Sequence, residues 1–233
     1  MSEQQAKSVR RAQKGSTAIS WGRKSKDPDR QREMKKEAVL KAAAAEFLAR
    51  GYHETTIDDI ASRLKVTKPS VYSYVENKEH ILVECSRLGY ERLDALLMKI
   101  DEEPGSALDR LRALFRGYGE YAMDEFGRCL ITLSDRAQER ENKEFIRSKR
   151  ADIQTRVKKL VAAGIEDGSI RPCRASHVSE ILVATFNGLH AWFKPSGDLS
   201  LHETVDQLLD LIFFGIAGER GISRDEGKAI VRK

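Results

Sequence analysis

The sequence predicts an all-α protein, and three features of it support this prediction. Apolar residues recur at helical spacing in one segment after another along the chain. Gly, Pro, Ser, Thr and Asn stand between these segments, as they do at helix ends. No stretch alternates apolar and polar residues with the period of two that marks a half-buried strand. We therefore expect helices packed on helices, without a sheet.

The composition narrows the class of protein. The chain has 233 residues, 40% of them hydrophobic and 33% charged, with a net charge of +5 and a pI of about 9.0. The mean hydropathy is -0.51, and no apolar run approaches the roughly 20 residues of a membrane helix. No apolar segment follows the basic N-terminus, so we expect no signal peptide. The expected location is the cytoplasm, without a membrane partner.

The cysteines and histidines indicate neither a metal site nor catalysis. Cys85, Cys129 and Cys173 lie far apart and form no CxxC pair, so we expect three free thiols. The histidines form no HxxxH or HExxH pair, and no glycine-rich phosphate loop or nucleophile motif occurs. A catalytic dyad of His190 with Cys129 finds no support in the spacing. We therefore expect no metal, no cofactor and no enzyme activity.

Residues 1–29 are expected to form a flexible basic arm. The segment is polar and rich in cations, with few acids, so it cannot bury enough surface to fold alone. It is either a solubilising tail or an arm that touches DNA phosphates and the minor groove. Trp21 is the exception, because an isolated indole is costly to leave in water, and we expect it to pack on the following domain. The cations are Lys7, Arg10, Arg11, Lys14, Arg23, Lys24 and Lys26.

A first helix is expected from about Asp29 to Arg50, and Gly51 ends it. Its apolar positions, from Val39 to Leu48, repeat at helical spacing, and its alanines allow neighbouring helices to come close. Three cations lie near its start, where they either reach a DNA backbone or form a solvated face. They are Arg32, Lys35 and Lys36.

The stretch from Thr55 to Lys78 has the pattern of a helix-turn-helix. Thr56 can cap a first short helix, since its hydroxyl can accept the free N–H groups of the opening turn. Thr67 can cap a second helix over about Lys68–Tyr74, and Pro69 suits its first turn. In a helix-turn-helix the second helix enters the major groove of DNA.

Every later segment also reads as helical. Asn77 caps the first of these helices, Ser106 the second and Ser176 the fifth, while Gly127 ends the second, whose apolar series includes Phe126. The expected ranges are Lys78–Ile100, Ser106 to about Glu125, Cys129–Ala137, 142–167, Ser176–Phe193 and Leu201–Ala217.

The helix-turn-helix resembles the DNA-binding domain of the TetR family of bacterial repressors. Two positions depart from the family pattern: Lys65 stands where the family usually has Gly, and Val75 where it usually has Phe. A non-Gly residue with positive φ costs about 1 kcal/mol, and Val can still fill a small core. The matching residues are Ala43–Phe47, Gly51, Tyr52, Thr55, Thr56, Ile60, Ala61, Val66, Thr67, Lys68, Val71, Tyr72, Tyr74, Asn77, Lys78 and Glu79.

Two later runs resemble a branch of the same family. Ile165–Pro172 is similar to an EGIxxGxIR stretch of these regulators, and Ala191–Ser200 to a W-Y/F-x-P-x-G-x-x-S segment. Several members of that branch govern fatty-acid or steroid breakdown. The resemblance implies a three-helix DNA-binding domain over 30–78, a ligand-binding and dimerisation domain over 79–222, and a tail over 223–233.

By this resemblance, Lys68, Tyr72 and Lys78 hold phosphates, while Pro69, Ser70 and Ser73 face base edges. No Arg or Gln lies on the second helix, so the strong bidentate readers of guanine and adenine are missing from it. Specificity would then come from thymine methyls, DNA shape or arginines of the arm. Tyr72 and Tyr74 are either DNA contacts or core aromatics. The candidate DNA-binding residues are Thr56, Thr67, Lys68, Pro69, Ser70, Tyr72, Ser73, Tyr74 and Lys78.

The C-terminal half supplies candidates for dimerisation and for an effector pocket. A single domain makes a small DNA interface, so two half-sites of a palindrome and a homodimer are expected. The family dimerises through its last two long helices, and the candidate interface residues are Leu189, Trp192, Leu209, Ile212 and Phe213. Apolar walls with a few polar tips suit a pocket, although such residues also serve as plain core. The pocket candidates are Phe115, Tyr118, Tyr121, Met123, Phe126, Phe186, Asn187 and His190.

The expected function is that of a homodimeric transcriptional repressor, released from its operator by a small, largely apolar effector such as an acyl-CoA thioester. The alternative is a DNA-binding protein of the same fold without a small effector, acting in chromosome organisation or division. Either protein would work at the nucleoid.

Overall fold

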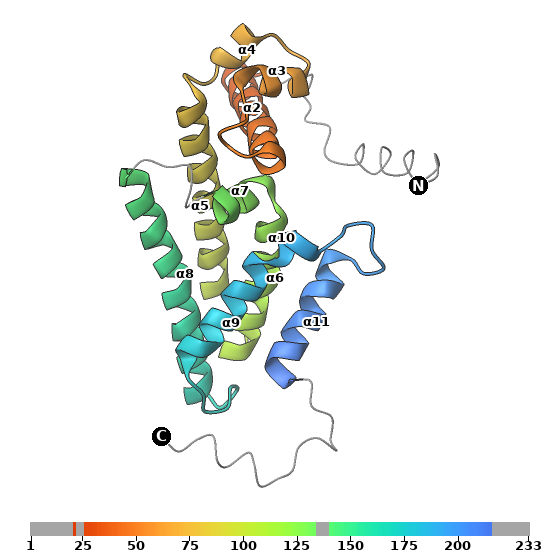
Figure 1. The fold of residues 1–233 in the computed structure, drawn as a ribbon. Coiled ribbons are helices and arrows are strands. Elements are labelled where there is room, and N and C mark those ends of the chain that lie inside the picture. Colours follow the sequence, from red (N-terminus) through yellow and green to blue (C-terminus); the bar gives the residue numbers. More distant parts are fainter. Residues whose placement is uncertain (1–20, 22–25, 134–139, 216–233) are drawn as a thin grey trace, which may run out of the picture. The chain divides into compact units, whose positions relative to one another are not determined.

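The computed structural model describes residue 21, residues 26–133 and residues 140–215 (Figure 1). Every regular element within these ranges is a helix, and they hold no strand, which confirms the all-α prediction. None of the helices described there is long and apolar enough to cross a membrane. The chain divides into two compact units, Met1–Gly89 with Arg128–Gln138, and Tyr90–Gly127 with Glu139–Lys233.

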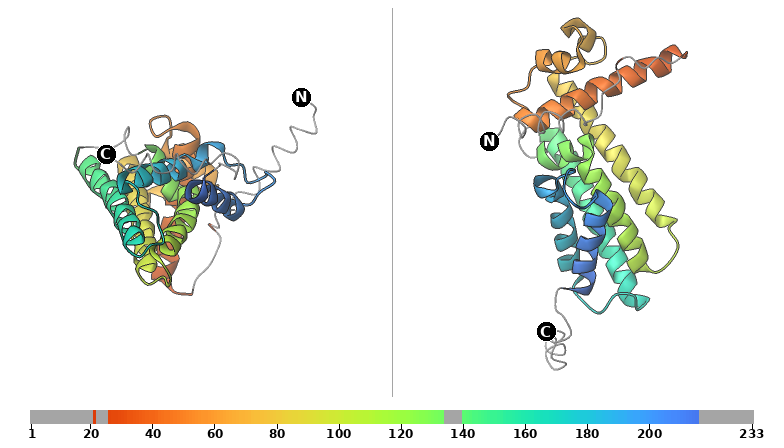
Figure 2. Two further views of the ribbon diagram at one scale, coloured as in Figure 1. Left: turned by 90° about the horizontal axis from the view of Figure 1, so that it is seen from below. Right: turned by 90° about the vertical axis from the view of Figure 1, so that its right-hand side faces the viewer.

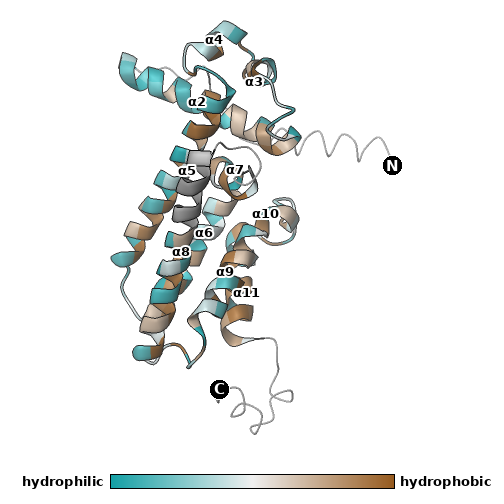
Figure 3. Cartoon of the chain, turned by 60° about the vertical axis from the view of Figure 1, so that its left-hand side comes forward, coloured by the Kyte–Doolittle hydropathy of each residue, from teal (hydrophilic) through white to brown (hydrophobic). Residues whose placement is uncertain are grey.

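The first unit contains α2 (Pro28–Arg50), α3 (Ile57–Leu64), α4 (Lys68–Tyr72) and the first half of α5 (Lys78–Asp101). Asp27 caps α2, since its carboxylate accepts the N–H of Asp29 at 3.0 Å. Gly51 ends α2 with φ of 91°, a region that favours glycine. The start of α2 is hydrophilic and its later part hydrophobic, as Figure 3 shows.

The core of the first unit forms where α2, α3, α4 and α5 supply apolar residues. Ala42, Ala43 and Ala44 of α2 are fully buried, which lets α3 pack closely on that helix. Each large apolar side chain buried here contributes about 1.5–3 kcal/mol. Asn77 caps α5 as expected, because its side chain accepts the N–H of His80 at 2.7 Å. The buried residues include Leu40, Phe47, Ile60, Leu64, Val71, Ile81 and Leu82.

Two of the free thiols are buried in this unit. Cys85 donates to the Leu40 carbonyl oxygen at 3.5 Å, and burial raises its pKa well above the usual range. Burial likewise raises the pKa of Cys129 to about 12. Both thiols therefore stay protonated and act as small apolar residues. Cys173 is exposed.

The second unit is built around α6 (Ala107–Met123). This helix contacts α8 (Arg140–Glu166), α9 (Ala175–Asn187), α10 (Leu189–Trp192) and α11 (Leu201–Phe214). Figure 2 shows α8, α9 and α11 running beside it. A Cβ built on Gly119 of α6 would lie 2.6 Å from a methyl group of Val205, so glycine permits this close approach of α11. Buried apolar residues line the contacts, among them Leu111, Leu114, Val157, Val161, Leu182, Val205 and Leu209.

Several helix boundaries differ from the predicted ones. α6 ends at Met123, and Phe126 and Gly127 belong to α7 (Glu125–Leu133), so Gly127 does not end a helix. The Asp124 carboxylate accepts the N–H of Phe126 at 3.0 Å, and this cap starts α7 earlier than expected. Residues 134–137 of the expected helix lie outside the described part of the chain.

The predicted helix from Ser176 to Phe193 is also interrupted. α9 begins at Ala175, after Arg174, and ends at Asn187, and Gly188 separates it from the short α10. Ser176 therefore lies inside the helix and does not cap it. α11 ends at Phe214, because Gly215 with φ of 79° closes it three residues before the expected end.

Candidate DNA-binding site

The turn between α3 and α4 depends on Lys65. Its φ of 58° and ψ of 43° place it in the left-handed region, and no other non-Gly residue in the described ranges has a positive φ. The strain, about 1 kcal/mol, is offset where the N–H groups of Lys65 and Val66 donate to carbonyl oxygens of α3. Val75 is buried, as expected for a residue that fills a small core. Both departures from the family pattern are thus accommodated.

A capping box fixes the start of α3. Thr56 accepts the N–H of Asp59 at 3.2 Å, and the Asp59 carboxylate in turn accepts the Thr56 N–H at 2.9 Å. The Thr56 hydroxyl also donates to that carboxylate at 2.7 Å, and Arg50 pairs with it from the end of α2. These bonds, those from Thr56 first, lower the pKa of Asp59 to about 2. The expected cap by Thr56 is confirmed.

α4 presents one polar face to solvent. Lys68, Pro69, Tyr72 and Ser73 are exposed, whereas Val71 between them is fully buried in the core of the first unit. The side chain of Tyr72 is 46% exposed, so it is not a core aromatic. Ser70 is half-buried. The structure thus brings the candidate residues of α4 onto one surface that a DNA groove could meet.

Local bonds occupy the polar groups of α4. The hydroxyl groups of Thr67 and Ser70 lie 2.9 Å apart, and Thr67 makes no side-chain bond to the helix backbone, although it occupies the N-cap position. Ser73 donates to the Pro69 carbonyl oxygen at 3.1 Å. Lys68 donates to Asp58 of α3 at 2.8 Å, and this bond raises the pKa of Lys68. All of these bonds are exposed and can be exchanged for bonds to DNA.

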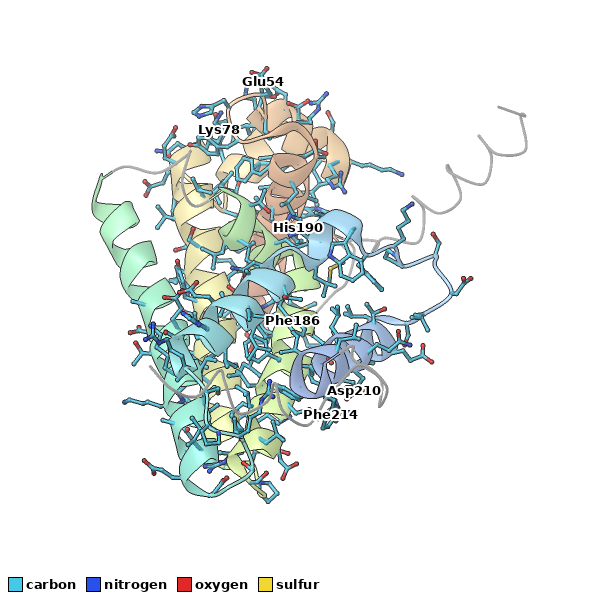
Figure 4. The ribbon with its side chains drawn as sticks, turned by 60° about the horizontal axis from the view of Figure 1, so that its bottom comes forward. Glu54, Lys78, Phe186, His190, Asp210 and Phe214 are labelled. Carbon is cyan, nitrogen blue, oxygen red and sulfur yellow. The ribbon has the colours of Figure 1, made fainter. Side chains whose placement is uncertain are left out.

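Lys78 is bonded differently from the other candidates. Its ammonium group donates to the carbonyl oxygens of Tyr52 at 3.1 Å, His53 at 3.3 Å and Thr55 at 3.1 Å. It also lies 4.6 Å from the ring centre of Tyr52. Figure 4 labels Lys78 in the first unit. A Lys ammonium has three donors, so a phosphate contact by Lys78 requires exchange or sharing of one of these bonds.

Trp21 packs on the DNA-binding unit, as expected. Its ring meets that of Tyr74 edge-on, with ring centres 5.6 Å apart. The ammonium of Lys35 lies 5.4 Å from the Trp21 ring centre. Tyr74 is therefore half-buried rather than fully exposed. The other residues of the predicted arm, apart from 26–29, lie outside the described residues.

Most of the predicted effector residues form one cluster in the second unit. The ring centres of Phe115 and Phe186 are 5.0 Å apart, and Tyr118 donates to the Asn187 side-chain oxygen at 2.8 Å. Tyr121 packs on Tyr118, and His190 Nδ1 lies 2.8 Å from the Asn187 carbonyl oxygen. Figure 4 labels Phe186 and His190 in this region. The arrangement combines aromatic walls with a few polar tips.

Phe126 and Met123 are the remaining two residues predicted for this pocket. Phe126 is fully buried and lies under the Arg92 guanidinium, 4.8 Å from its ring centre, while Met123 is half-buried.

The predicted dimer residues divide into two groups. Leu189 and Leu209 are fully buried within the single chain, so they have no exposed surface to offer to a partner. Trp192 is exposed by 51%, and Ile212 and Phe213 are half-buried.

Three more apolar residues are strongly exposed: Ile181, Leu211 and Phe214. The signal was present in the sequence, because α11 has apolar residues on the face of Leu211 and Phe214 as well as on its core face.

Two family models match the chain. The model of the bacterial regulatory proteins of the tetR family matches residues 39–85, which contain α3, the turn and α4. The model of the tetracyclin repressor-like C-terminal domain matches residues 104–216, from the loop before α6 to the end of α11. The chain therefore belongs to the TetR family of bacterial transcriptional regulators.

Individual relatives cover most of the chain. The HTH-type transcriptional repressor KstR2 of Mycolicibacterium smegmatis is 25% identical over 190 residues, which are 80% of this chain and 93% of the relative. The solved structure of KstR2 of Mycobacterium tuberculosis has a TM-score of 0.72 and 24% identity, and covers 79% of this chain and 96% of that chain.

The structure of AibR in complex with isovaleryl coenzyme A and operator DNA has a TM-score of 0.67 and 21% identity, over 76% of this chain and 97% of that chain. At these identities the solved structures establish the shared fold.

Proposed function

We propose that this chain is a homodimeric transcriptional repressor, released from a palindromic operator by a small, largely apolar effector. The observation that carries the proposal is the exposed polar face of α4 in a helix-turn-helix of the TetR family. Relatives named as repressors over most of the chain support the direction of regulation. In this proposal residues 30–78 read DNA, and residues 79–222 bind the effector and dimerise, in the cytoplasm and without catalysis. Residues 1–29 form an arm and residues 223–233 a tail.

The DNA contacts follow from the exposed groups. Lys68 and Tyr72 hold phosphates, and Lys78 does so when one of its carbonyl bonds is exchanged. Pro69, Ser70 and Ser73 face base edges, with Thr56, Thr67 and Tyr74 beside them. Phosphate contacts position the helix in the groove, whereas base contacts select the sequence. Because α4 carries no Arg or Gln, much of the selection comes from thymine methyls and DNA shape.

The dimer and the effector site belong to the second unit. Exposed apolar side chains on α9, α10 and α11 form the two-fold interface, with Ile181, Trp192, Leu211 and Phe214 at its centre. The aromatic cluster around Phe115 and Phe186 opens to hold the effector. The AibR structure with isovaleryl coenzyme A supports an acyl-CoA thioester as the ligand class. The effector acts only through its difference in affinity for the DNA-bound and free states.

The test uses duplexes selected from a random library by the full chain. We expect a palindromic consensus, and an affinity that falls with salt with a log–log slope of about −0.9 for each neutralised phosphate. A flat salt response would contradict groove binding. Acyl-CoA thioesters of increasing chain length are then titrated into the complex. Release by one length class supports the effector proposal, while release by none leaves the alternative, a DNA-binding protein without a small effector.

A further inference from the structure

Trp21, Lys35 and Tyr74 bring together parts of the first unit that are far apart in the sequence. Trp21 precedes α2, Lys35 lies in the second turn of α2, and Tyr74 follows the recognition helix α4 by two residues. The indole ring contacts both partners, with Tyr74 at 5.6 Å edge-on and the Lys35 ammonium at 5.4 Å from the ring centre. All three side chains are half-buried. We call this group the Trp21 cluster.

Lys35 differs from its neighbouring lysines on α2 in its partner. Lys36 pairs with Glu84 at 2.6 Å, and Lys41 pairs with Glu37 at 3.0 Å. Lys35 has no carboxylate partner among the residues that the structure describes, and it meets an aromatic ring instead. An aromatic ring attracts the cation without neutralising its charge, and it leaves the N–H donors available. Lys35 is thus positioned by the Trp21 ring, while its positive charge is not neutralised by a described carboxylate.

The other two members of the cluster also offer donors. Neither the Trp21 indole N–H nor the Tyr74 hydroxyl bonds to another described residue in the structure. An ammonium, an indole N–H and a phenol are all groups that bind the oxygens of a phosphate. These groups lie next to the exposed face of α4. If α4 enters the major groove, the DNA backbone at the edge of that groove lies beside them.

We propose that the Trp21 cluster is a second phosphate-binding site for the DNA backbone, with Lys35 as the contact and Trp21 as the residue that positions it. The ligand is a phosphodiester beside the half-site, outside the bases that α4 reads. This inference rests on the proposed function, since it assumes that α4 enters DNA.

The test measures affinity and salt slope for the duplex selected by the full chain. Lys35→Gln is expected to make the slope less steep by about 0.9 for each bound subunit, and to lower affinity about eightfold per subunit at 0.1 M salt. Lys41→Gln is the matched control, because that lysine lies on the same helix but is already paired, and its slope should equal that of the unchanged protein. A Lys35→Gln slope equal to that of the control would overturn the proposal.

Trp21→Ala tests the positioning role. It should lower affinity by a similar factor, and the double variant with Lys35→Gln should bind as weakly as Lys35→Gln alone, because the two residues act through one contact. Independent, multiplying effects would show that Trp21 does not act through Lys35. DNA should also change the Trp fluorescence of the full chain, and this change should be absent in Trp21→Phe.

Two failures can be told apart. If the unchanged full chain binds no duplex with a salt-dependent affinity, the proposed function itself is wrong. If it binds as expected but neither variant alters affinity or slope, only the role of the Trp21 cluster is wrong. Circular dichroism of each variant confirms that the helices are intact.

Discussion

Tyr72 is the aromatic residue of α4, and its side chain is exposed. Its side chain is 46% exposed, although Val71 beside it is fully buried. Substitution of an exposed residue usually changes stability by less than about 0.5 kcal/mol. We therefore expect Tyr72→Ala to weaken operator binding more than tenfold, at least about 1.4 kcal/mol, and to leave the dimer and the melting temperature unchanged. Fluorescence anisotropy and thermal unfolding measure the two effects.

Tyr72→Phe is the companion variant. It keeps the ring and removes the hydroxyl, so an affinity close to that of Tyr72→Ala assigns the contact to the phosphate-binding hydroxyl. A large drop in melting temperature for Tyr72→Ala would instead show that the ring supports the core.

Asp59 carries a prediction about pH. Its pKa is about 2 in the folded chain, below the ordinary value of 3.8. A carboxylate with a lowered pKa stabilises the fold above its ordinary pKa, and that stabilisation is lost as the pH falls through the lowered value. The capping box should therefore weaken between about pH 4 and pH 2. Thr56→Val should raise the pKa of Asp59 towards its ordinary value, as measured by an NMR titration of the carboxyl carbon.

Asp109 is the internal control for this measurement. It forms the same kind of capping box with Ser106 at the start of α6, and bonds from Ser106 lower its pKa. Thr56→Val should leave the Asp109 titration unchanged. If both carboxyl groups shift together, the change reflects a general loss of structure.

Among the helices, the corner between α6 and α7 depends on a few specific contacts. Asp124 ends α6, caps α7 and pairs with Arg92, which in turn lies over the ring of Phe126. A Cβ built on Gly127 would collide with the carbonyl oxygen of Tyr121. Because that atom is backbone, it cannot move aside as a flexible side chain would. We expect Gly127→Ala to lower the free energy of unfolding by about 1–3 kcal/mol, as measured by urea unfolding.

Gly188 provides the matched control for Gly127. Gly188 lies between α9 and α10, its backbone is α-helical, and the nearest atom to a built Cβ is 3.4 Å away. Gly188→Ala should be neutral or stabilise the chain by about 0.4–1 kcal/mol, because it restricts the unfolded state. An equal loss of stability in both variants would show that the collision with the Tyr121 carbonyl oxygen is not the cause of the loss.

The helix series was predictable because each element has its own apolar period and most have a capping residue. The boundaries near Asp124 and Gly188 were not, since they depend on which side chain caps which N–H group, and several residues nearby could serve. Gly127 reads as a helix breaker in the sequence. In the structure it is the small residue on which two helix ends meet, and only tertiary contacts decide between these roles.

At the scale of the whole molecule, the exposed apolar side chains of α11 predict self-association. Phe214 is 71% exposed and Leu211 50%, although both belong to the helix that buries Val205 and Leu209. Figure 4 labels Phe214 and Asp210 near the end of this helix. We expect Phe214→Asp to convert the dimer into monomers at micromolar concentration, as measured by analytical ultracentrifugation. Operator affinity should fall in parallel, because each monomer reaches only one half-site.

Met98 supplies the control for the dimer test. It lies on α5 in the same unit and is also 71% exposed, but it lies outside the proposed interface. Met98→Asp should remain dimeric. Dissociation of both variants would indicate a general effect of the added charge.

The sites were predictable to different degrees. The recognition face could be predicted, because helical spacing separates Val71 from Lys68 and Tyr72. The dimer residues could not be separated from the core in advance, since Leu209 and Leu211 are equally apolar and differ only in which way the helix turns them. The contact between Lys35 and Trp21 could not be predicted either, because the two residues are 14 positions apart in the sequence.

In a genetic screen for loss of repression, substitutions of Lys78 and of Tyr72 should have the same phenotype, because both are expected to abolish regulation. The ammonium of Lys78, however, joins the loop before α3 to the first turn of α5 through three carbonyl oxygens. A mutant phenotype at this position therefore reflects the loss of the contact between that loop and α5, even where the lysine contributes nothing to recognising the promoter.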